Sequence, residues 1–217
     1  LCKERNISVY NVRDYSSSSV AELAIGLTLA VLREIPKGEN VLRNGGWAFS
    51  PGGNDLRGKT VGIVGTGTIG ICTAKLFNAF GCKLIGWSRS ERQEFKDLGG
   101  IYVSREELFS TADIVSLHIP NNKETRKCIG ENDFQLLKPT SVLINTARGQ
   151  VCDQDALVKY LVNGKFRAGL DVYAIEPLPE DDGGLRKCDN VVITPHVAYK
   201  TKEALTRRAA ITANNAI

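Results

Sequence analysis

The chain has 217 residues, of which 42% are hydrophobic and 24% charged, a composition typical of a globular protein that can bury a sizeable core. The net charge of +4 is small, and Lys and Arg are interleaved with Asp and Glu, which argues against a nucleic-acid partner. No apolar run reaches about 18 residues and the first residues lack a signal-peptide core, so we expect no membrane partner.

The cysteine pattern indicates the cellular compartment and whether a cysteine-based metal site is to be expected. None of the six cysteines forms a C-x-x-C pair, and their spacing matches no zinc or disulfide framework. We therefore expect free thiols, no metal site and a cytoplasmic location. Methionine is absent, so the sequence is expected to begin inside a longer protein.

The first expected element is a helix within 16–35, because apolar residues recur at helical spacing through Leu32, and Ser19 with Glu22 fits a capping box. A Gly-, Asn- and Pro-rich stretch at 44–58 predicts an exposed loop. Strands and helices alternate from Lys59 onward. The expected strands are 59–65, 83–88, 101–103, 113–120, 141–147, 168–173 and 190–196; the expected helices are 68–81, 105–112, 131–138 before Pro139, 152–164 capped by Gly164, and 201–217.

Several of these strands are apolar on both faces, and helices of roughly 8–14 residues separate them. Such a pattern requires crossover connections and a parallel sheet covered on both sides. The sequence therefore predicts an α/β fold with a doubly wound parallel sheet and helices on both faces.

A glycine-rich turn follows the strand that begins at Lys59. Gly65, Gly67 and Gly70 have the G-x-G-x-x-G spacing, with Thr68 and Ile69 opening the next helix. After a strand and before a helix, this motif predicts a dinucleotide site of the Rossmann type. Gly65 allows the turn, Gly67 lets a pyrophosphate approach the backbone, and Gly70 allows close helix packing, while the helix N-terminus attracts the phosphates.

The residue that binds the adenosine ribose is usually acidic and lies about 20 residues further on. This chain instead has Ser88, Arg89 and Ser90 there. A carboxylate would repel a 2′-phosphate, whereas a guanidinium donates hydrogen bonds to phosphate oxygens. We therefore favour NADP(H) as the cofactor, with NAD(H) and a solvated Arg89 as the alternative.

Chemically active residues follow the later strands. Arg148 comes just after the strand at 141–147. Asp171 lies at the end of the strand at 168–173, Glu176 lies beyond it, and His196 ends the strand at 190–196. Ligands bind outside the carboxyl ends of parallel strands, so these side chains should meet in one crevice. Arg148 suits a substrate carboxylate, His196 suits proton transfer to an alkoxide, and Glu176 suits orienting the imidazole. Together they predict reduction of a 2-keto acid.

The motifs VAE, GKTVGIVGTGTIG, SLHIP, LINTARG, LDVYAIEP and ITPHVA, between about Val20 and Thr201, together resemble the nucleotide-binding domain of the D-isomer-specific 2-hydroxyacid dehydrogenases. The resemblance implies that Arg148, Glu176 and His196 are the catalytic residues and that Asp171 binds the nicotinamide carboxamide. It implies further dinucleotide contacts from His118 and Pro120 on the adenine side, with a structural strand-end role as the alternative for His118, and from Thr146, Ala147 and Ala198.

Within this family, WSRS at 87–90 resembles NADPH-using glyoxylate/hydroxypyruvate reductases and some D-lactate dehydrogenases. The short segment between Glu176 and His196 favours a glyoxylate, hydroxypyruvate or glycerate type. Two alternatives remain: a co-repressor-like module that keeps the dinucleotide as a structural ligand, and a relative acting on formate or phosphite. Glu176 argues against the formate type, which typically has glutamine there.

The resemblance also predicts domain organisation. We expect residues 16–200 to form the NAD(P)-binding domain, with 1–15 and 201–217 as remnants of, or connections to, a substrate domain that this sequence largely lacks. The chain alone is then expected to bind dinucleotide but to reduce little keto acid. The family usually forms dimers through this domain, so we expect a homodimer that uses the helix from Ser19 to Ile35 and the segment containing Trp47.

Overall fold

The computed structural model describes residues 2–47 and 52–216, with the side chains of Lys3 and Ala216 excepted. The predicted loop 44–58 and the predicted closing helix each extend in part outside these residues, at 48–51 and at 217. In the described residues, the sheet has seven strands, all parallel. They are β1 Thr60–Val64, β2 Lys83–Trp87, β3 Ile101–Tyr102, β4 Ile114–Leu117, β5 Val142–Asn145, β6 Arg167–Leu170 and β7 Val191–Ile193.

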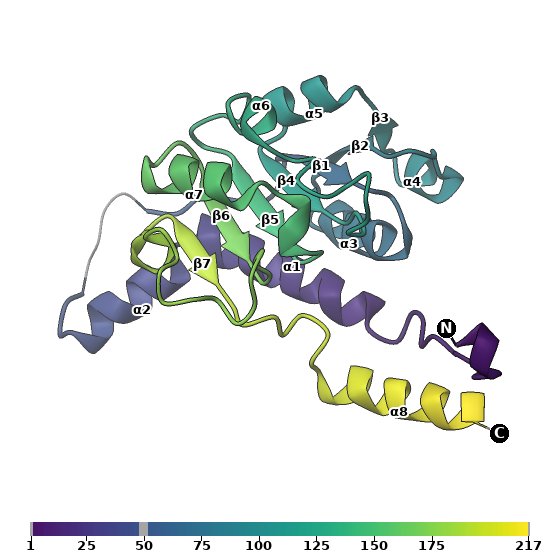
Figure 1. Cartoon of the computed structure of the whole chain (residues 1–217). Coiled ribbons are helices and arrows are strands. Elements are labelled where there is room, and N and C mark those ends of the chain that lie inside the picture. The colour runs from purple at the N-terminus through teal and green to yellow at the C-terminus, as the bar shows by residue number, and fades with distance from the viewer. Residues whose placement is uncertain (1, 48–51, 217) are drawn as a thin grey trace.

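The strand order is β3-β2-β1-β4-β5-β6-β7, so the direction of winding reverses between β1 and β4 (Figure 1). A crevice opens at such a reversal outside the carboxyl ends of the strands. The predicted doubly wound α/β fold is confirmed. The helices are η1 Lys3–Arg5, α1 Ser17–Leu32, α2 Ile35–Arg43, α3 Thr68–Ala79, α4 Gln93–Asp97, α5 Arg105–Thr111, α6 Glu131–Phe134, η2 Gly149–Val151, α7 Gln154–Val162, η3 Leu185–Lys187 and α8 Lys202–Ala216.

Helices cover both faces of the sheet, and each face has its own hydrophobic core. On one face, α1 and α3 pack against β1 and β5 through fully buried side chains such as Phe77 and Ile63. On the other face, α5, α6 and α7 enclose Phe109, Phe134 and Phe166. Burial on both sides explains why β1, β4 and β5 are almost wholly apolar.

Several helix boundaries differ from the sequence prediction, and two helices were not predicted. The helix α1 begins at Ser17 after Ser16, without a side-chain cap, so the predicted capping box of Ser19 and Glu22 is wrong. Ser19 is already inside the first turn, and its hydroxyl bonds to that of Thr201. The helix α6 ends at Phe134, four residues before the predicted end, and Leu137 beyond it is buried in the core. The helices α2 and α4 were not predicted: α2 contains Pro36 and Gly38, which usually indicate a loop, and α4 has only five residues.

Two segments extend from the α/β body. The helix α8 lies with the amino-terminal segment, below the sheet as drawn (Figure 1), where Arg207 Nε donates to the Tyr15 carbonyl at 2.8 Å. The helix α2 extends at the other end and has no buried residue. In the part of the chain that the structure describes, no helix is long and apolar enough to span a bilayer.

Candidate active site

The turn between β1 and α3 has a separate steric demand at each of its glycines. Gly65 has a φ of +93°, which side chains disfavour, and a Cβ on Gly70 would lie 2.0 Å from the Gly65 carbonyl oxygen. A Cβ on Gly67 would meet nothing within 4 Å. The fold therefore requires glycine at 65 and 70, whereas Gly67 leaves open space in front of the α3 N-terminus, where a phosphate binds in such turns.

A cavity of about 700 Å³ opens in front of this turn. It contains predicted site residues from four segments that are far apart in the sequence. They are Gly67, Thr68 and Ile69 after β1, His118 and Pro120 after β4, Thr146, Ala147 and Arg148 after β5, and His196 and Ala198 after β7.

Two buried polar atoms on this cavity have no hydrogen-bond partner among the residues that the structure describes. They are Nδ1 of His118 and Oγ1 of Thr146. The other ring nitrogen of His118 bonds to the Ser116 hydroxyl at 2.9 Å, and burial lowers the pKa of His118 to about 4. Buried polar atoms nearly always have a partner, so this part of the cavity suits a ligand with hydrogen-bonding groups, such as the riboses of a dinucleotide.

Asp171 lies fully buried at the end of β6 and holds the segment that follows β7. Its carboxylate accepts hydrogen bonds from the Thr194 hydroxyl at 2.6 Å and from the Val197 and Ala198 amides, both at 2.9 Å. Between these donors, His196 has a φ of +54°, an unfavourable backbone angle for a residue with a side chain. The hydrogen bonds to Asp171 therefore hold His196 in a strained conformation, as is common at functional sites.

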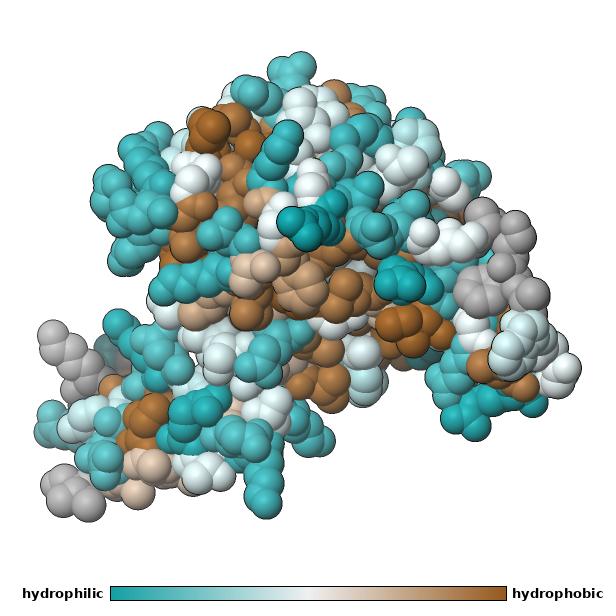
Figure 2. Space-filling view, turned by 180° about the vertical axis from the view of Figure 1, so that it is seen from behind, coloured by the Kyte–Doolittle hydropathy of each residue, from teal (hydrophilic) through white to brown (hydrophobic). Residues whose placement is uncertain are grey.

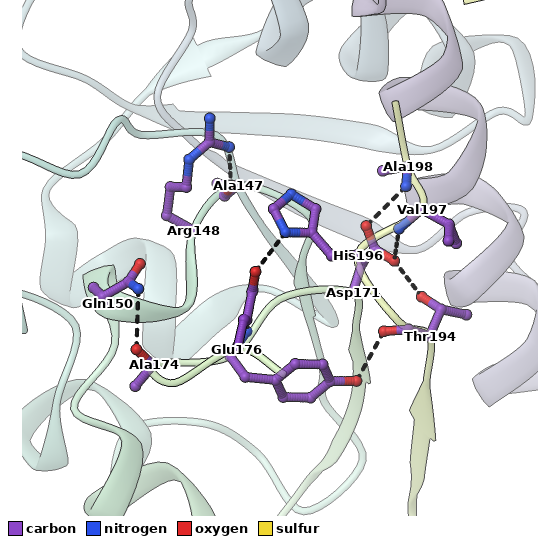
Figure 3. A network of polar contacts seen from close by, with 11 residues as sticks. Ala147, Arg148, Gln150, Asp171, Ala174, Glu176, Thr194, His196, Val197 and Ala198 are labelled. Atoms are coloured by element: carbon purple, nitrogen blue, oxygen red, sulfur yellow. Dashed lines mark hydrogen bonds and ion pairs between the residues drawn. The ribbon is translucent and has the colours of Figure 1, made fainter. Parts of the chain in front are cut away.

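Glu176 and His196 form a short polar contact at this edge of the sheet (Figure 3). His196 Nδ1 donates to Glu176 Oε2 at 2.6 Å, and the second carboxylate oxygen accepts from the Tyr173 amide at 2.9 Å. Both carboxylate oxygens are thus fixed, and Nε2 of the imidazole has no hydrogen bond among the described residues. His196 lines both the dinucleotide-side cavity and a second, mostly apolar cavity of about 770 Å³ that contains Glu176 and Tyr199.

Arg148 projects from a tight turn after β5, on the same side of the sheet as His196 (Figure 3). The Asn145 side chain closes this turn, because it donates to the Arg148 carbonyl and accepts from the Ala147 amide. A Cβ on Gly149 would lie 1.9 Å from the Tyr173 carbonyl carbon, so the turn packs directly on the loop that carries Glu176. The sequence prediction missed the roles of Asn145 and Gly149, although both lie within the NTARG motif.

The predicted ribose loop lies apart from the cavity. Ser88, Arg89 and Ser90 follow β2 and are not among the residues that line it. The Arg89 side chain is 89% exposed, and its nearest carboxylate is that of Glu124 at 3.8 Å. The structure therefore leaves this guanidinium accessible to an added anion.

The cavity also contains residues that the sequence prediction did not include. Ser16 and Ser17 at the start of α1 line it, as do Tyr199 after β7 and Arg208 on α8. The four-serine run at 16–19 signalled only a helix start, and nothing in the local sequence of α8 indicates that it approaches the crevice. Their recruitment depends on how the chain ends fold back onto the carboxyl edge.

The six cysteines are all free and scattered over the fold. Burial raises the pKa of the Cys82 thiol to about 11, and burial also raises the pKa of Cys152. Among the described residues, no group of three or more His, Cys, Asp or Glu side chains is arranged to hold a metal ion.

Comparison with known proteins matches residues 25–198 to the family described as D-isomer specific 2-hydroxyacid dehydrogenase, NAD binding domain. A glyoxylate reductase of Thermococcus litoralis is 41% identical over 224 residues, which cover 99% of this chain and 67% of the relative. A D-lactate dehydrogenase of Aquifex aeolicus, solved with NAD and lactic acid, superposes with a TM-score of 0.92 at 34% identity, covering 99% of this chain and 70% of that one.

An acyclic imino acid reductase, solved with NADPH and D-Arg, superposes with a TM-score of 0.88 at 34% identity, covering 99% of this chain and 68% of that one. The chain thus spans about two thirds of the length of the proteins that it matches. The matched segment extends from α1 to the end of the segment that carries His196, and it includes the whole sheet. This chain belongs to the D-isomer specific 2-hydroxyacid dehydrogenase family and contains that family's NAD-binding domain.

Proposed function

We propose that this chain is the dinucleotide-binding part of an oxidoreductase that transfers a hydride between NADP(H) and a small D-2-hydroxy or 2-keto acid, of the glyoxylate or hydroxypyruvate type. The 2.6 Å contact between Glu176 and His196, at the rim of the cavity that contains the glycine-rich turn, carries this proposal. A co-repressor-like module, which is the alternative function, would not require Glu176 and His196 to form this contact.

The proposed roles follow from the geometry. When bound, the nicotinamide supplies or accepts the hydride. Glu176 keeps the Nδ1 proton of His196 in place and stabilises the imidazolium, so that Nε2 can give a proton to the alkoxide oxygen of the product or take it from the hydroxyl of a substrate. Arg148 would hold the substrate carboxylate in a bidentate pair, after exchanging its present bond to the Ala147 carbonyl.

The cofactor would lie along the carboxyl ends of the strands. Thr68 and Ile69 offer their amides to the pyrophosphate, as Gly67 leaves room for it. His118 and Pro120 would contact the adenine side, Thr146, Ala147 and Ala198 would contact the rest of the dinucleotide, and Asp171 would bind the nicotinamide carboxamide. Gly65 and Gly70 shape the turn, and Ser88, Arg89 and Ser90 would bind the 2′-phosphate. The charge and exposure of Arg89 support NADP(H) over NAD(H).

Fluorescence titrations of this chain with NADPH and with NADH test the cofactor assignment. We expect tighter binding of NADPH, and Arg89→Ala should weaken it by about tenfold while leaving NADH unchanged, because one charged hydrogen-bond pair to phosphate is lost. Arg126→Ala removes another exposed positive charge and is the matched control. Equal binding of both dinucleotides, unchanged by Arg89→Ala, would restore NAD(H) as the working cofactor.

Keto-acid reduction tests the catalytic assignment. NADPH oxidation with glyoxylate and hydroxypyruvate should be weak for the 217-residue chain, and strong for a chimera that adds the part of the Thermococcus litoralis enzyme that this chain does not match. In the chimera, His196→Asn should reduce kcat by about 10²- to 10⁴-fold, since a general acid is removed. Glu180→Gln, which neutralises an exposed carboxylate on the loop of Glu176, should have no effect. Equal activity of the His196 variant would contradict the assigned role.

Assembly as a homodimer is part of the same proposal. The apolar face of α1 is covered by its own sheet and by α3, so the free apolar surface lies on the arm that follows it. Ile35 and Leu42 on α2 are 54% and 56% exposed, and Trp47 beyond them is 89% exposed. Brown apolar surface is visible at this extended end in the space-filling view (Figure 2). The domain limits at 16–200 and a cytoplasmic location remain predictions.

A further inference from the structure

The hydroxyl group of Tyr102 joins two loops that are separate in the sequence. It lies 2.7 Å from the hydroxyl of Thr66, inside the glycine-rich turn. It also accepts a hydrogen bond of 2.9 Å from the backbone amide of Arg92, which ends the loop of Ser88, Arg89 and Ser90. One oxygen atom on β3 therefore ties the predicted pyrophosphate turn to the predicted ribose loop.

The ring that carries this hydroxyl is held firmly. Tyr102 pairs with Gly86 across the sheet, and its ring contacts the fully buried ring of Phe95 at a centroid distance of 5.1 Å. A Cβ on Gly86 would approach Phe95 to 2.7 Å, and a Cβ on Gly100 to 2.4 Å. Glycine at both positions therefore lets Phe95 pack beneath the sheet edge, where it supports Tyr102.

The glycine-rich turn has other supports that do not depend on Tyr102. The Gly65 amide donates to the Trp87 carbonyl at 2.8 Å, and the contact of Gly70 with Gly65 fixes the start of α3. Arg92 has a different situation, because it is the N-cap residue of α4 and its amide has Tyr102 as its acceptor. Loss of the hydroxyl should thus release the ribose loop more than the pyrophosphate turn.

We propose that Tyr102 is a positioning residue for dinucleotide selection, which fixes the distance between the turn that binds the pyrophosphate and the loop that reads the 2′ position. This inference rests on the proposed function, since it assumes that Ser88, Arg89 and Ser90 face the adenosine ribose. The pyrophosphate is common to both cofactors, whereas the 2′-phosphate is not. Loss of the Tyr102 hydroxyl should therefore change the ratio of the NADPH affinity to the NADH affinity, and not only lower both affinities.

Titrations of Tyr102→Phe with NADPH and NADH test this role, because the ring and its packing on Phe95 are kept. We expect the NADPH affinity to fall by about 3- to 10-fold, as for the loss of one hydrogen bond, with less than about a 2-fold change for NADH. Thr66→Val removes the other end of the link, and the double variant should show no further change in the ratio. Tyr160→Phe, on α7 over the other half of the sheet, is the matched control.

Hydrogen exchange of the free chain gives a readout that needs no ligand. Tyr102→Phe should speed exchange of the Arg92 amide, and Tyr160→Phe should not. Unchanged exchange, or an equal fall of both affinities, would overturn the inference. If wild-type protein does not distinguish NADPH from NADH, the proposed cofactor preference fails by itself. In that case hydrogen exchange of the Arg92 amide is the test of Tyr102. Exchange in Tyr102→Phe that is as slow as in the wild-type chain would refute the link.

Discussion

The two ends of the candidate site differ in how completely the chain satisfies its own polar groups. At the end formed by β6 and β7, Asp171 accepts three hydrogen bonds and both oxygens of Glu176 are engaged. At the end formed by β2, the Arg89 side chain is 89% exposed and its contact with Glu124 spans 3.8 Å. We call the first end closed, because its carboxylates are paired within the fold even though the His196 and Glu176 side chains are 35% and 32% exposed, and we call the second end open.

This difference separates two kinds of function. Side chains that must hold a proton in a fixed place need partners within the protein, because misplacement by a fraction of an ångström is costly in catalysis. A guanidinium that recognises a phosphate can form its hydrogen bonds when the ligand binds, because its charge and the length of its side chain matter more than its position in the free protein. The same edge of one sheet thus carries both a rigid and an adaptable region.

The largest effect is expected at the closed end. Asp171→Asn should lower the free energy of unfolding by about 3 kcal/mol or more, because an amide NH2 would face the Ala198 or the Val197 amide in a buried place. Urea unfolding of the variant measures this, with Asp181→Asn on the exposed loop as the control. A loss below about 1 kcal/mol would show that the segment carrying His196 does not depend on Asp171.

The middle of the cavity should respond to pH through His118. Its pKa is lowered to about 4 from 6.5, so the unfolded chain takes up a proton that the folded chain refuses. Stability should therefore fall as pH drops from about 6.5 to 4, by up to about 3 kcal/mol, and be unaffected by this group above pH 7. Urea unfolding at several pH values should show a smaller slope for His118→Asn than for wild type; equal slopes would mean that the ring is solvated.

The glycine-rich turn allows stability and binding to be separated by one pair of variants. Gly70→Ala should cost about 1–3 kcal/mol of stability, because its Cβ meets the Gly65 carbonyl at 2.0 Å and the backbone must shift. Gly67→Ala should leave stability nearly unchanged, as its Cβ meets nothing within 4 Å and its φ is −72°. Gly67→Ala should nevertheless weaken dinucleotide binding in a titration. Normal binding by that variant would place the pyrophosphate elsewhere.

The smallest effect is expected at the open end. Glu124→Gln removes an exposed carboxylate next to Arg89, so stability should change by less than about 0.5 kcal/mol. The NADPH affinity should rise by about 2-fold at low salt, since a charge that repels the 2′-phosphate is gone, and the gain should vanish at high salt. Lower NADPH affinity in this variant would mean that Glu124 holds Arg89 in its binding position.

Much of the fold follows from local sequence. The alternation of apolar strands and helices predicts the parallel sheet, because strands buried on both faces have few polar residues. The helix α2 was missed because Pro36 and Gly38 weaken its helical signal, and α4, which has five residues, was not distinguished from a loop. The start of α1 was placed too late because four serines in a row offer several equivalent N-cap positions.

For the site, the sequence by itself determined the glycine-rich turn and the chemical types at the strand ends, because each depends on a short motif with its own steric or chemical logic. The positions of Glu176 and His196 after two strands also led to the prediction that Glu176 orients the imidazole. Only the tertiary structure decided that Asp171 holds the strained backbone around His196 and that Tyr102 joins two loops. These contacts link residues 10 to 36 positions apart, across strands whose order is set by packing of the whole sheet. No local pattern encodes such distances.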